Sequence, residues 1–312
     1  MGGGLREKQY ENRFFQGKAI YRGKESEVFK TVKTFGKYEV RKAEDEGYEL
    51  LKNGEVVGIF PEVKIEENRV LFKLSYGMNL EVSEREVREV LSPEKAELCG
   101  LIAADGSLPQ RREKGIYEAQ LTSKDKELAE IYTELSEKVY GITPHHYYMY
   151  RKTEREKERT YHRMSIYSKK VVEDLKSLEF KGPDPYEFHV PLKYLDDEGK
   201  RAFLKGFFSG DGSVSLSEGG RHAIYFYSEC KEGLEELRKV LIDLGFHPSK
   251  ICIDDREMVP KKYSGPTYEF SISEKEHIKF IDEIGSEREE HKLKFQIIRS
   301  INGEKRKRGE KE

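Results

Sequence analysis

Two short segments of this sequence share one pattern, in which an apolar run with small residues four positions apart ends in Asp-Gly. They are residues 98–106 (LCGLIAADG) and residues 204–212 (LKGFFSGDG). On a helix, residues four apart share one face, and the small residues there are Gly100 with Ala104 and Gly206 with Gly210. Because small side chains let two helix backbones approach closely, we predict that the segments are helices that pack through these faces.

Helices packed in this way bring their carboxyl-terminal ends together, and with them Asp105 and Asp211. Two carboxylates held close together repel each other, and a divalent metal ion with oxygen ligands relieves that repulsion. The pair therefore predicts a metal site, with backbone carbonyls near Ala104 and Gly210 as further ligands. The alternative, for a single copy, is a buried apolar helix that ends in an Asp-Gly turn.

The two segments belong to a longer internal repeat. Asp211 follows Asp105 by 106 residues, and each motif is followed by a strand, at residues 116–121 and 223–228. Amphipathic helices come next, with apolar residues at Leu128, Ile131 and Leu135 and, 106 positions later, at Leu234, Leu237 and Leu241. Further landmarks are the helix-ending glycines, Gly141 and Gly245, and the last strands, which end at Ile166 and Ile272. Coincidence would not preserve nearly one offset so often, so the repeat predicts an α+β fold of two pseudo-symmetric αββαββα units.

The domain boundaries follow from this repeat. The repeats are predicted at residues 92–181 and 195–300, with a proline-rich linker at residues 182–194. The remaining segments are predicted as a tail (residues 1–17), a small, mostly β domain (residues 18–91) and a basic, solvated tail (residues 301–312).

Two local signals stand out in the small β domain. Asn53-Gly54 predicts a type I′ turn between two strands. Ser83 and Glu86 have the spacing of a capping box, which predicts a short helix. Because the domain carries no catalytic constellation, we interpret it as a scaffold or docking module, with an extra DNA-contacting module as the alternative.

The paired motifs resemble those of the LAGLIDADG homing endonucleases, in the single-chain, two-motif form of the archaeal type. The resemblance covers roughly residues 92–298 and rests on Asp105, Asp211 and the glycine after each. Ala103 and Ser209 depart from the family pattern, at a position that does not bind metal in the family. The resemblance implies a monomeric, site-specific endonuclease that cuts both strands of a long, pseudo-palindromic DNA duplex, with one aspartate serving each strand.

The implied cofactor is Mg²⁺ (or Mn²⁺), held by the paired aspartates as a hard cation. In the family, a Lys at the end of the second β segment often lies near the metal-bound water, and the matching residue is Lys124. The offset of 106 leads from Lys124 to Cys230, which carries no fixed positive charge. We therefore predict unequal electrostatic support in the two half-sites, and faster cleavage of one strand.

The antiparallel strands of each repeat are expected to present polar side chains to the DNA major groove. In this role Arg and Gln read base edges, and Lys mostly contacts phosphate. The predicted DNA contacts of the first repeat are Arg111, Arg112, Gln120, Arg151, Lys152 and Arg163. Those of the second repeat are Arg221, His222, Tyr225, Tyr227, Arg256, Lys261 and Lys262. The alternative for any one of them is a solvated surface side chain.

Composition limits these expectations only loosely. The net charge of -2 gives no support to a nucleic-acid partner, so any basic surface must be local. The sequence contains no membrane-spanning run and no signal-peptide pattern, and its three scattered cysteines are typical of a cytoplasmic protein with reduced thiols. Charged residues make up 37% of the chain, a bias that resembles thermophile proteins.

Three alternatives remain open for a chain with these motifs. The first is a maturase that binds intron RNA, and the second is a DNA-binding regulator that has lost catalysis. Retention of both Asp105 and Asp211 argues against the second and does not separate the first from an endonuclease. The third is an intein, which is disfavoured because the sequence lacks a nucleophile at its start and a closing His-Asn.

Overall fold

The computed structural model describes residues 30–43, 47–84, 86–111, 115–151, 159–182, 187–218, 220–253 and 266–309. The chain divides into two compact units. The first unit contains the described residues up to Ser75 together with Asn79–Glu89, and the second contains Tyr76–Met78 and the residues from Val90 onward. None of the helices within these ranges has both the length and the apolar content that crossing a membrane requires.

The first unit is built from β-strands alone in its described part. One antiparallel sheet runs in the order β1 (Lys30–Phe35), β2 (Tyr38–Ala43), β3 (Gly47–Lys52), β4 (Glu55–Phe60). The other runs in the order β5 (Val63–Ile65), β6 (Arg69–Lys73), β7 (Met78–Ser83), β8 (Val87–Leu91). Fully buried Val40, Val70 and Phe72 form the centre of its core, so this unit folds around its own apolar residues.

The type I′ turn predicted between β3 and β4 is confirmed. Asn53 and Gly54 both have positive φ, at 53° and 85°, as this turn requires. The short helix predicted after Ser83 is wrong. The amide of Glu86 does donate to the Ser83 hydroxyl at 3.3 Å, but this bond closes a turn between β7 and β8. The valines and leucine of β8 favour a strand, and the capping-box spacing alone does not separate the two outcomes.

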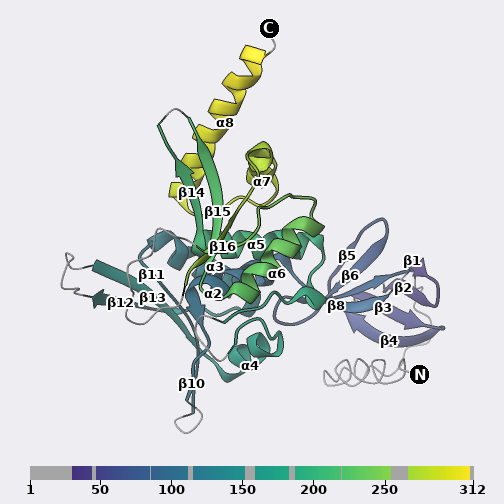
Figure 1. Ribbon diagram of the computed structural model, residues 1–312. Coiled ribbons are helices and arrows are strands. Elements are labelled where there is room, and N and C mark those ends of the chain that lie inside the picture. The colour runs from purple at the N-terminus through teal and green to yellow at the C-terminus, as the bar shows by residue number, and fades with distance from the viewer. Residues whose placement is uncertain are drawn as a thin grey trace. The chain divides into compact units, whose positions relative to one another are not determined.

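The first repeat of the second unit has the predicted order of elements (Figure 1). Its elements are α2 (Pro93–Asp105), β9 (Gly106–Ser107), β10 (Gln110–Arg111), β11 (Ile116–Ser123), α3 (Lys126–Tyr140), β12 (His145–Arg151), β13 (Arg159–Tyr167) and α4 (Lys169–Ser177). Its antiparallel sheet has the strand order β10-β11-β13-β12, and β9 also pairs with β11.

The second repeat has the same strand order, β14-β15-β17-β16. Its elements are the 3₁₀ turn η2 (Leu192–Tyr194), α5 (Asp197–Asp211), β14 (Gly212–Leu216), β15 (His222–Ser228), α6 (Lys231–Asp243), β16 (Cys252–Ile253), β17 (Tyr268–Ser271), the 3₁₀ turn η4 (Glu274–Glu276), α7 (His277–Glu283) and α8 (Glu289–Gly309). The predicted α+β fold with two pseudo-symmetric repeats is confirmed. Helix α8 lies beside the β14–β15 hairpin and continues to Gly309, into the residues predicted as a solvated tail (Figure 1).

The two repeats do not keep an offset of 106 throughout. Gly106 pairs with Leu121 and Gly212 pairs with Phe226, so the offset falls to 105 in the second strand. Buried positions of α3 are 128, 129, 132, 135, 136, 139 and 140, and those of α6 and its end are 233, 234, 237, 240, 241 and 244, so the first six positions of α3 match those of α6 at an offset of 105. The equivalent of Lys124 is therefore Glu229, and the predicted match with Cys230 is wrong by one residue.

Helices α2 and α5 pack against each other through the small residues of the two motifs. A Cβ atom added at Gly100 would lie 2.1 Å from the carbonyl oxygen of Phe203. Such a close approach is possible only because residue 100 carries no side chain, and Gly206 meets the carbonyl oxygen of Glu97 in the same way. The fully buried Phe203 and Phe207 of α5 continue the core on either side, so the helix pair is the centre of the second unit.

Candidate active site

The sequence fixes both ends of the two central helices. The Ser92 hydroxyl accepts the amide of Lys95 at 3.3 Å at the start of α2, and the Asp196 carboxylate accepts the amide of Gly199 at 2.8 Å at the start of α5. At the other end, Gly106 follows α2, and a Cβ atom there would lie 2.7 Å from the Cα of Ile102. A glycine is therefore needed to take the chain from the helix into the next strand directly after the aspartate.

Asp105 and Asp211 are the last residues of α2 and α5, and both side chains are partly exposed. A Cβ atom added at Gly210 would lie 2.5 Å from the Cβ of Ala104 and 3.6 Å from Asp105 Oδ2, so the Asp105 carboxylate reaches the end of α5. Loss of hydration raises the pKa of Asp105 to about 6. Loss of hydration, followed by the charge of Asp105, raises the pKa of Asp211 to about 8. The two carboxylates therefore form the closely placed pair that the motifs predict.

Two cations, Arg288 and Lys181, act on this pair. Both oppose the rise of the two aspartate pKa values; Arg288 has the larger effect on Asp105, and Lys181 has the larger effect on Asp211. Lys181 Nζ also donates to the carbonyl oxygen of Ala103 at 3.1 Å, which places it beside the end of α2. Of the two cations, the one from the other repeat thus has the larger effect on each aspartate.

The sequence prediction did not include these two cations. A signal was available, because Lys181 and Arg288 are 107 residues apart and each follows the last short helix of its repeat. One of these residues is a lysine and the other an arginine, and their offset of 107 differs by one from the offset of 106 between the two motifs. The correspondence between Lys181 and Arg288 therefore becomes visible only when the helices before them are known.

Lys124, the predicted catalytic lysine, directly follows β11 of the first repeat. Its Nζ lies 5.7 Å from the ring centroid of Tyr161, and its side chain is exposed. The equivalent residue of the second repeat, Glu229, raises the pKa of Asp211 through its negative charge. A cation in one half-site therefore corresponds to an anion in the other, and a catalytic role for Lys124 stays a prediction.

The polar face of the first sheet carries two of the predicted DNA contacts. Gln120 Nε2 donates to Ser107 Oγ at 2.6 Å, and Gln120 Oε1 is buried without a hydrogen-bond partner. Arg163 Nη2 lies 2.7 Å from Glu118 Oε1, a carboxylate that also accepts the Ser165 hydroxyl at 2.7 Å. Arg163 is therefore oriented by protein contacts, and the buried Oε1 of Gln120 has unused acceptor capacity.

The second sheet differs at the equivalent positions. Tyr225 and Tyr227 lie beside each other on the polar face, with ring centroids 5.7 Å apart. Thr122 pairs with Arg163, whereas Tyr227 pairs with Glu269, so a glutamate takes the place of the arginine. The first sheet thus offers a cation and an amide where the second offers aromatic rings and an anion.

The other predicted contacts have mixed outcomes. His222 is buried, on the same side of β15 as Ile224 and Phe226, and its Nδ1 lies 2.7 Å from His277 Nδ1, so the predicted DNA contact is corrected to an internal pair. Arg221 is exposed. The side chains of Arg111 and Arg151, and the whole of Arg112, Lys152, Arg256, Lys261 and Lys262, lie outside the described residues.

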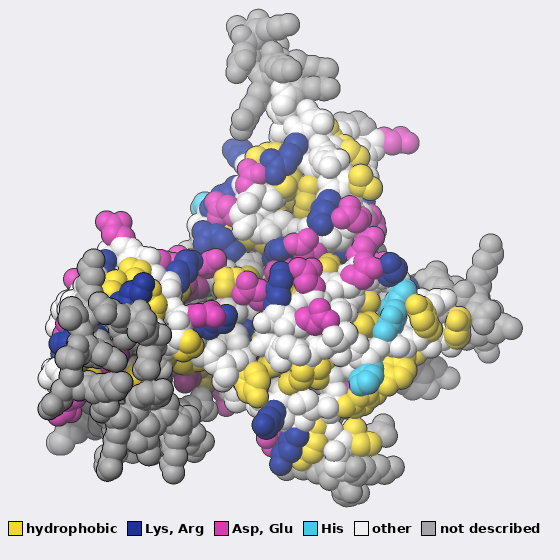
Figure 2. Space-filling view, turned by 180° about the vertical axis from the view of Figure 1, so that it is seen from behind, with side chains coloured by type: hydrophobic (Ala, Val, Ile, Leu, Met, Phe, Trp, Pro, Cys, Tyr) yellow, Lys and Arg dark blue, Asp and Glu magenta, His cyan; other side chains and the backbone are white. Residues whose placement is uncertain are grey.

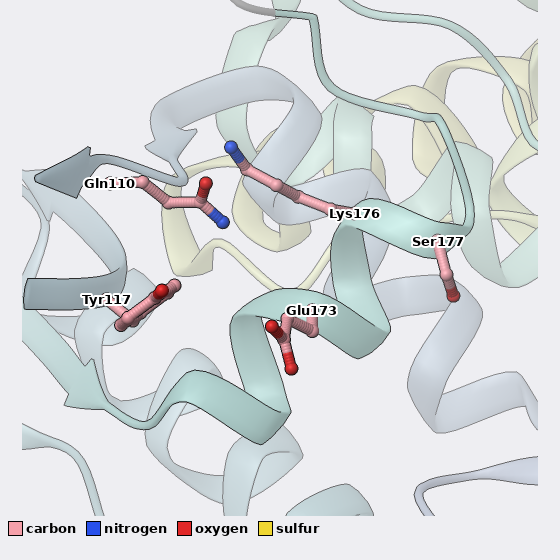
Figure 3. Close-up of a pocket in the computed structure, with 5 residues that line it drawn as sticks. All are labelled: Gln110, Tyr117, Glu173, Lys176 and Ser177. Carbon is pink, nitrogen blue, oxygen red and sulfur yellow. The ribbon is translucent and has the colours of Figure 1, made fainter. Parts of the chain in front are cut away.

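Charges of both signs are interleaved on the face of the molecule in Figure 2, among patches of hydrophobic and polar side chains. A pocket of about 500 Å³ lies elsewhere in the first repeat, between β10, β11 and α4 (Figure 3). It is lined by Gln110, Tyr117, Glu173, Lys176 and Ser177, and Lys176 extends from α4 toward Gln110. Neither Asp105 nor Asp211 lines this pocket.

The paired aspartates fit a Mg²⁺-type ion. Within the described ranges, no group of three or more His, Cys, Asp or Glu side chains is arranged to hold a metal. Mg²⁺ does not need such a cage, because it is commonly held by one or two carboxylates together with water and substrate phosphates. The donors at Asp105 and Asp211 are all oxygen, and their pKa values are raised first by loss of hydration, an effect that a bound cation would oppose.

Comparison with known proteins places this arrangement in context. The chain is 27% identical over 258 residues to the replication factor C small subunit of Methanocaldococcus jannaschii, a match that covers 80% of this chain and 12% of that protein. The matched part is therefore a small fraction of the relative.

Solved structures similar to this chain include two proteins described as homing endonucleases. One is I-DmoI in complex with DNA and Mn, with 21% identity, a TM-score of 0.45, and coverage of 62% of this chain and 96% of that one. Another is I-WcaI bound to its DNA recognition sequence, with 17% identity, a TM-score of 0.48, and coverage of 65% and 85%.

The family is shown by the sequence itself. The sequence model of the LAGLIDADG-like domain matches residues 92–178 and 198–285, which together make up more than half of the chain. The first match contains α2, the second contains all but the first residue of α5, and each includes the terminal aspartate of its helix. The chain therefore belongs to the LAGLIDADG-like domain family and carries two copies of the family domain.

Proposed function

We propose that this protein is a site-specific DNA endonuclease that uses a divalent metal ion, Mg²⁺ or Mn²⁺, to cut both strands of a long, pseudo-palindromic duplex. The observation that carries the proposal is the pairing of Asp105 and Asp211 at the ends of α2 and α5. A fold that needed these helices only for stability would gain nothing from two mutually repelling carboxylates there.

The carboxylates of Asp105 and Asp211 would hold the metal, and the carbonyls of Ala104 and Gly210 remain candidate ligands. When bound, such an ion supplies an activated water and neutralises charge on the phosphate and the leaving oxygen. Lys181 and Arg288 supply fixed positive charge at the same place, where phosphate oxygens would approach. The pseudo-symmetry of the repeats suits a duplex, because each half presents one aspartate to one strand.

DNA binding would use the polar faces of the two sheets. On the first sheet, Arg163 is oriented by Glu118 and Gln120 by Ser107, so both are prepared to contact base edges. On the second sheet, Tyr225 and Tyr227 offer aromatic and hydroxyl contacts. The two halves of the target are therefore expected to differ in sequence. The chain is proposed to act as a monomer, since it contains both halves.

The direct test is to incubate the protein with a randomised duplex library in Mg²⁺ and to sequence the ends that are produced. The proposal expects one target, with a defined cut on each strand, and no cutting in the presence of a chelator. Duplex binding without cutting in either Mg²⁺ or Mn²⁺ would contradict it and favour a regulator. Preferential binding of structured intron RNA without DNA cleavage would favour a maturase.

A further inference from the structure

Arg288 connects the two repeats across the candidate active site. The carbonyl oxygen of Arg288 accepts the amide of Lys292 at 3.0 Å, so the residue immediately precedes α8 in the second repeat. Its guanidinium reaches the first repeat, where Nη2 lies 2.7 Å from Asp125 Oδ2. Only 19% of the Arg288 side chain is exposed, against 37% for Asp125, so the pair is partly shielded from water.

Asp125 pairs with Arg288 instead of forming the N-cap hydrogen bond that its position before α3 favours. It is the N-cap residue of α3, but its side chain makes no capping hydrogen bond. Ser92, Ser168 and Asp196 occupy the same position on α2, α4 and α5, and each of them does accept an amide of its own helix. The Asp125 carboxylate therefore pairs with Arg288 and does not form an N-cap hydrogen bond, which typically contributes about 1 kcal/mol.

The main chain of Arg288 is held from the opposite side. Its amide donates to Ser286 Oγ at 3.3 Å, and the amide of the preceding Glu287 donates to Ser209 Oγ at 3.0 Å. Ser286 Oγ also lies 2.8 Å from Nδ1 of the buried His291. Arg288 is thus held at its backbone by the second repeat, and its guanidinium lies 2.7 Å from Asp125 of the first repeat and, farther away, 3.7 Å from Glu290 of α8.

The residue equivalent to Asp125 in the second repeat is Cys230, which carries no carboxylate to pair with a cation. The N-cap of α6 is Cys230, whose sulfur accepts the amide of Gly233 at 3.4 Å and thereby caps its own helix. The cation equivalent to Arg288 is Lys181, which donates to the neutral carbonyl of Ala103. Arg288 is therefore paired with a carboxylate of the other repeat, and Lys181 contacts a peptide oxygen.

We propose that Asp125 is a positioning residue that holds Arg288 beside Asp105 for the strand that Asp105 serves. This inference rests on the proposed endonuclease function. The ion pair orients the guanidinium and leaves its other N–H groups available to a phosphate. Without Asp125, Arg288 keeps its charge and loses its fixed direction. Cleavage of one strand then depends on Asp125, while the other strand relies on Lys181.

The test is single-turnover cleavage in Mg²⁺ of the parent's own target duplex, with each strand end-labelled. The strand served by Asp105 is identified as the one slowed more by Asp105→Asn. Asp125→Asn keeps the size and capping ability of the side chain and removes its charge. We expect this variant to slow that strand about tenfold or more and the other less than about twofold, as loss of orientation at one centre predicts.

Three further variants separate positioning from a merely structural contact. Asp125→Glu restores a carboxylate and should recover most of the lost rate. Asp125→Asn combined with Arg288→Ala should be no slower than Arg288→Ala alone, because Asp125 supports cleavage through Arg288, and its own charge only raises the pKa of Asp105. Cys230→Ser keeps the cap of α6 and should leave both strand rates unchanged. Thermal unfolding of each variant, without DNA, checks that all of them are folded.

The outcomes distinguish the two proposals. A parent protein that cuts neither strand in Mg²⁺ or Mn²⁺ overturns the proposed function, and this inference with it. A parent that cuts, together with an Asp125→Asn variant that cuts both strands at parental rates or slows both equally, overturns the inference alone. Additive losses in the Asp125 and Arg288 double variant also overturn it.

Discussion

Gly206 of α5 lies directly against the carbonyl oxygen of Glu97 in α2, and a Cβ atom at Gly206 would lie 2.1 Å from that oxygen. The contact is reciprocal, because Gly100 of α2 meets the carbonyl oxygen of Phe203 at the same distance. Both neighbours are backbone atoms, which cannot move aside by changing rotamer. The helix spacing at the centre of the second unit is therefore set by two glycines.

Substituting Gly206 by Ala should destabilise the second unit strongly. The added methyl group forces the two helices apart, and overpacking of this kind costs about 1–3 kcal/mol or more. Differential scanning calorimetry should show a fall in Tm of at least about 4 °C, given the size of the unit. Gly303→Ala in α8 is the matched control, because a Cβ atom there has no neighbour within 4 Å. A Gly206→Ala variant that melts with the parent would rule out packing through this face.

Replacing either aspartate of the pair by Asn should raise the stability of the protein. Burial and repulsion raise the pKa of Asp211 from 3.8 to about 8, so the folded state loses stability as pH rises between these values. Asp211→Asn removes that loss and should raise Tm by at least about 2–4 °C at pH 8, equivalent to about 1 kcal/mol. Near pH 4 parent and variant should melt alike. A variant that is less stable than its parent at pH 8 would refute the assignment of strain to this pair.

Removing the metal should separate cutting from binding. A chelator should abolish cleavage of the target duplex, and Mg²⁺ or Mn²⁺ should restore it, because the carboxylates alone activate no water. Binding, measured by fluorescence anisotropy, should persist, since the proposed DNA contacts lie on the sheets and not at the metal. Asp105→Asn and Asp211→Asn should each lose at least about 100-fold in cleavage rate, the size of effect seen when electrostatic stabilisation is removed. Full activity in either variant would remove that aspartate from the chemistry.

The two strands should be cut at different rates. Lys124 in the first half-site corresponds to Glu229 in the second, where the negative charge raises the pKa of Asp211. A nicked intermediate should therefore accumulate during cleavage of supercoiled plasmid. Lys124→Met should slow the first nick, and Glu229→Lys should narrow the difference between strands by making the two positions alike. Equal strand rates in the parent, with no nicked species at any time, would remove the basis of this prediction.

The buried His291 should make the protein sensitive to acid. Burial, and then the charge of Arg288, lowers the pKa of His291 to about 4, from 6.5. A histidine with a lowered folded pKa is fully compatible with the fold above pH 6.5, and stability is lost as pH falls from there toward 4. The loss should approach about 1–3 kcal/mol. His291→Gln removes this titration. The Tm of the variant minus the Tm of the parent should therefore increase as the pH is lowered from 6.5 to 4. A constant difference across this range would contradict the prediction.

Local interactions explain what the sequence predicted correctly. Asn53-Gly54 tolerates positive φ, Ser92 and Asp196 accept amides of their own helices, and these preferences act over a few residues. The doubled motif also predicted one contact between distant segments, because close packing of the two glycine faces allows only one way to join α2 and α5. From that contact the placement of the aspartate pair follows.

The structure alone decided the features that depend on register and on distant segments. One residue fewer between β14 and β15 shifts the correspondence from Cys230 to Glu229, and a one-residue shift in a strand reverses the direction of a side chain. The same alternation turns His222 into the core.

The positions of the two cations of the site, Lys181 and Arg288, could not be predicted from the sequence. Arg288 follows Asp105 by 183 residues, and its position depends on the packing of α7, α8 and α3. The sequence by itself determined the repeated fold, the glycine contact between two helices and the pair of aspartates, because each follows from a pattern that occurs twice in the chain. Only the tertiary structure decided which charges surround that pair, because electrostatic effects depend on distance in space and on burial, and neither is set by neighbours in the chain.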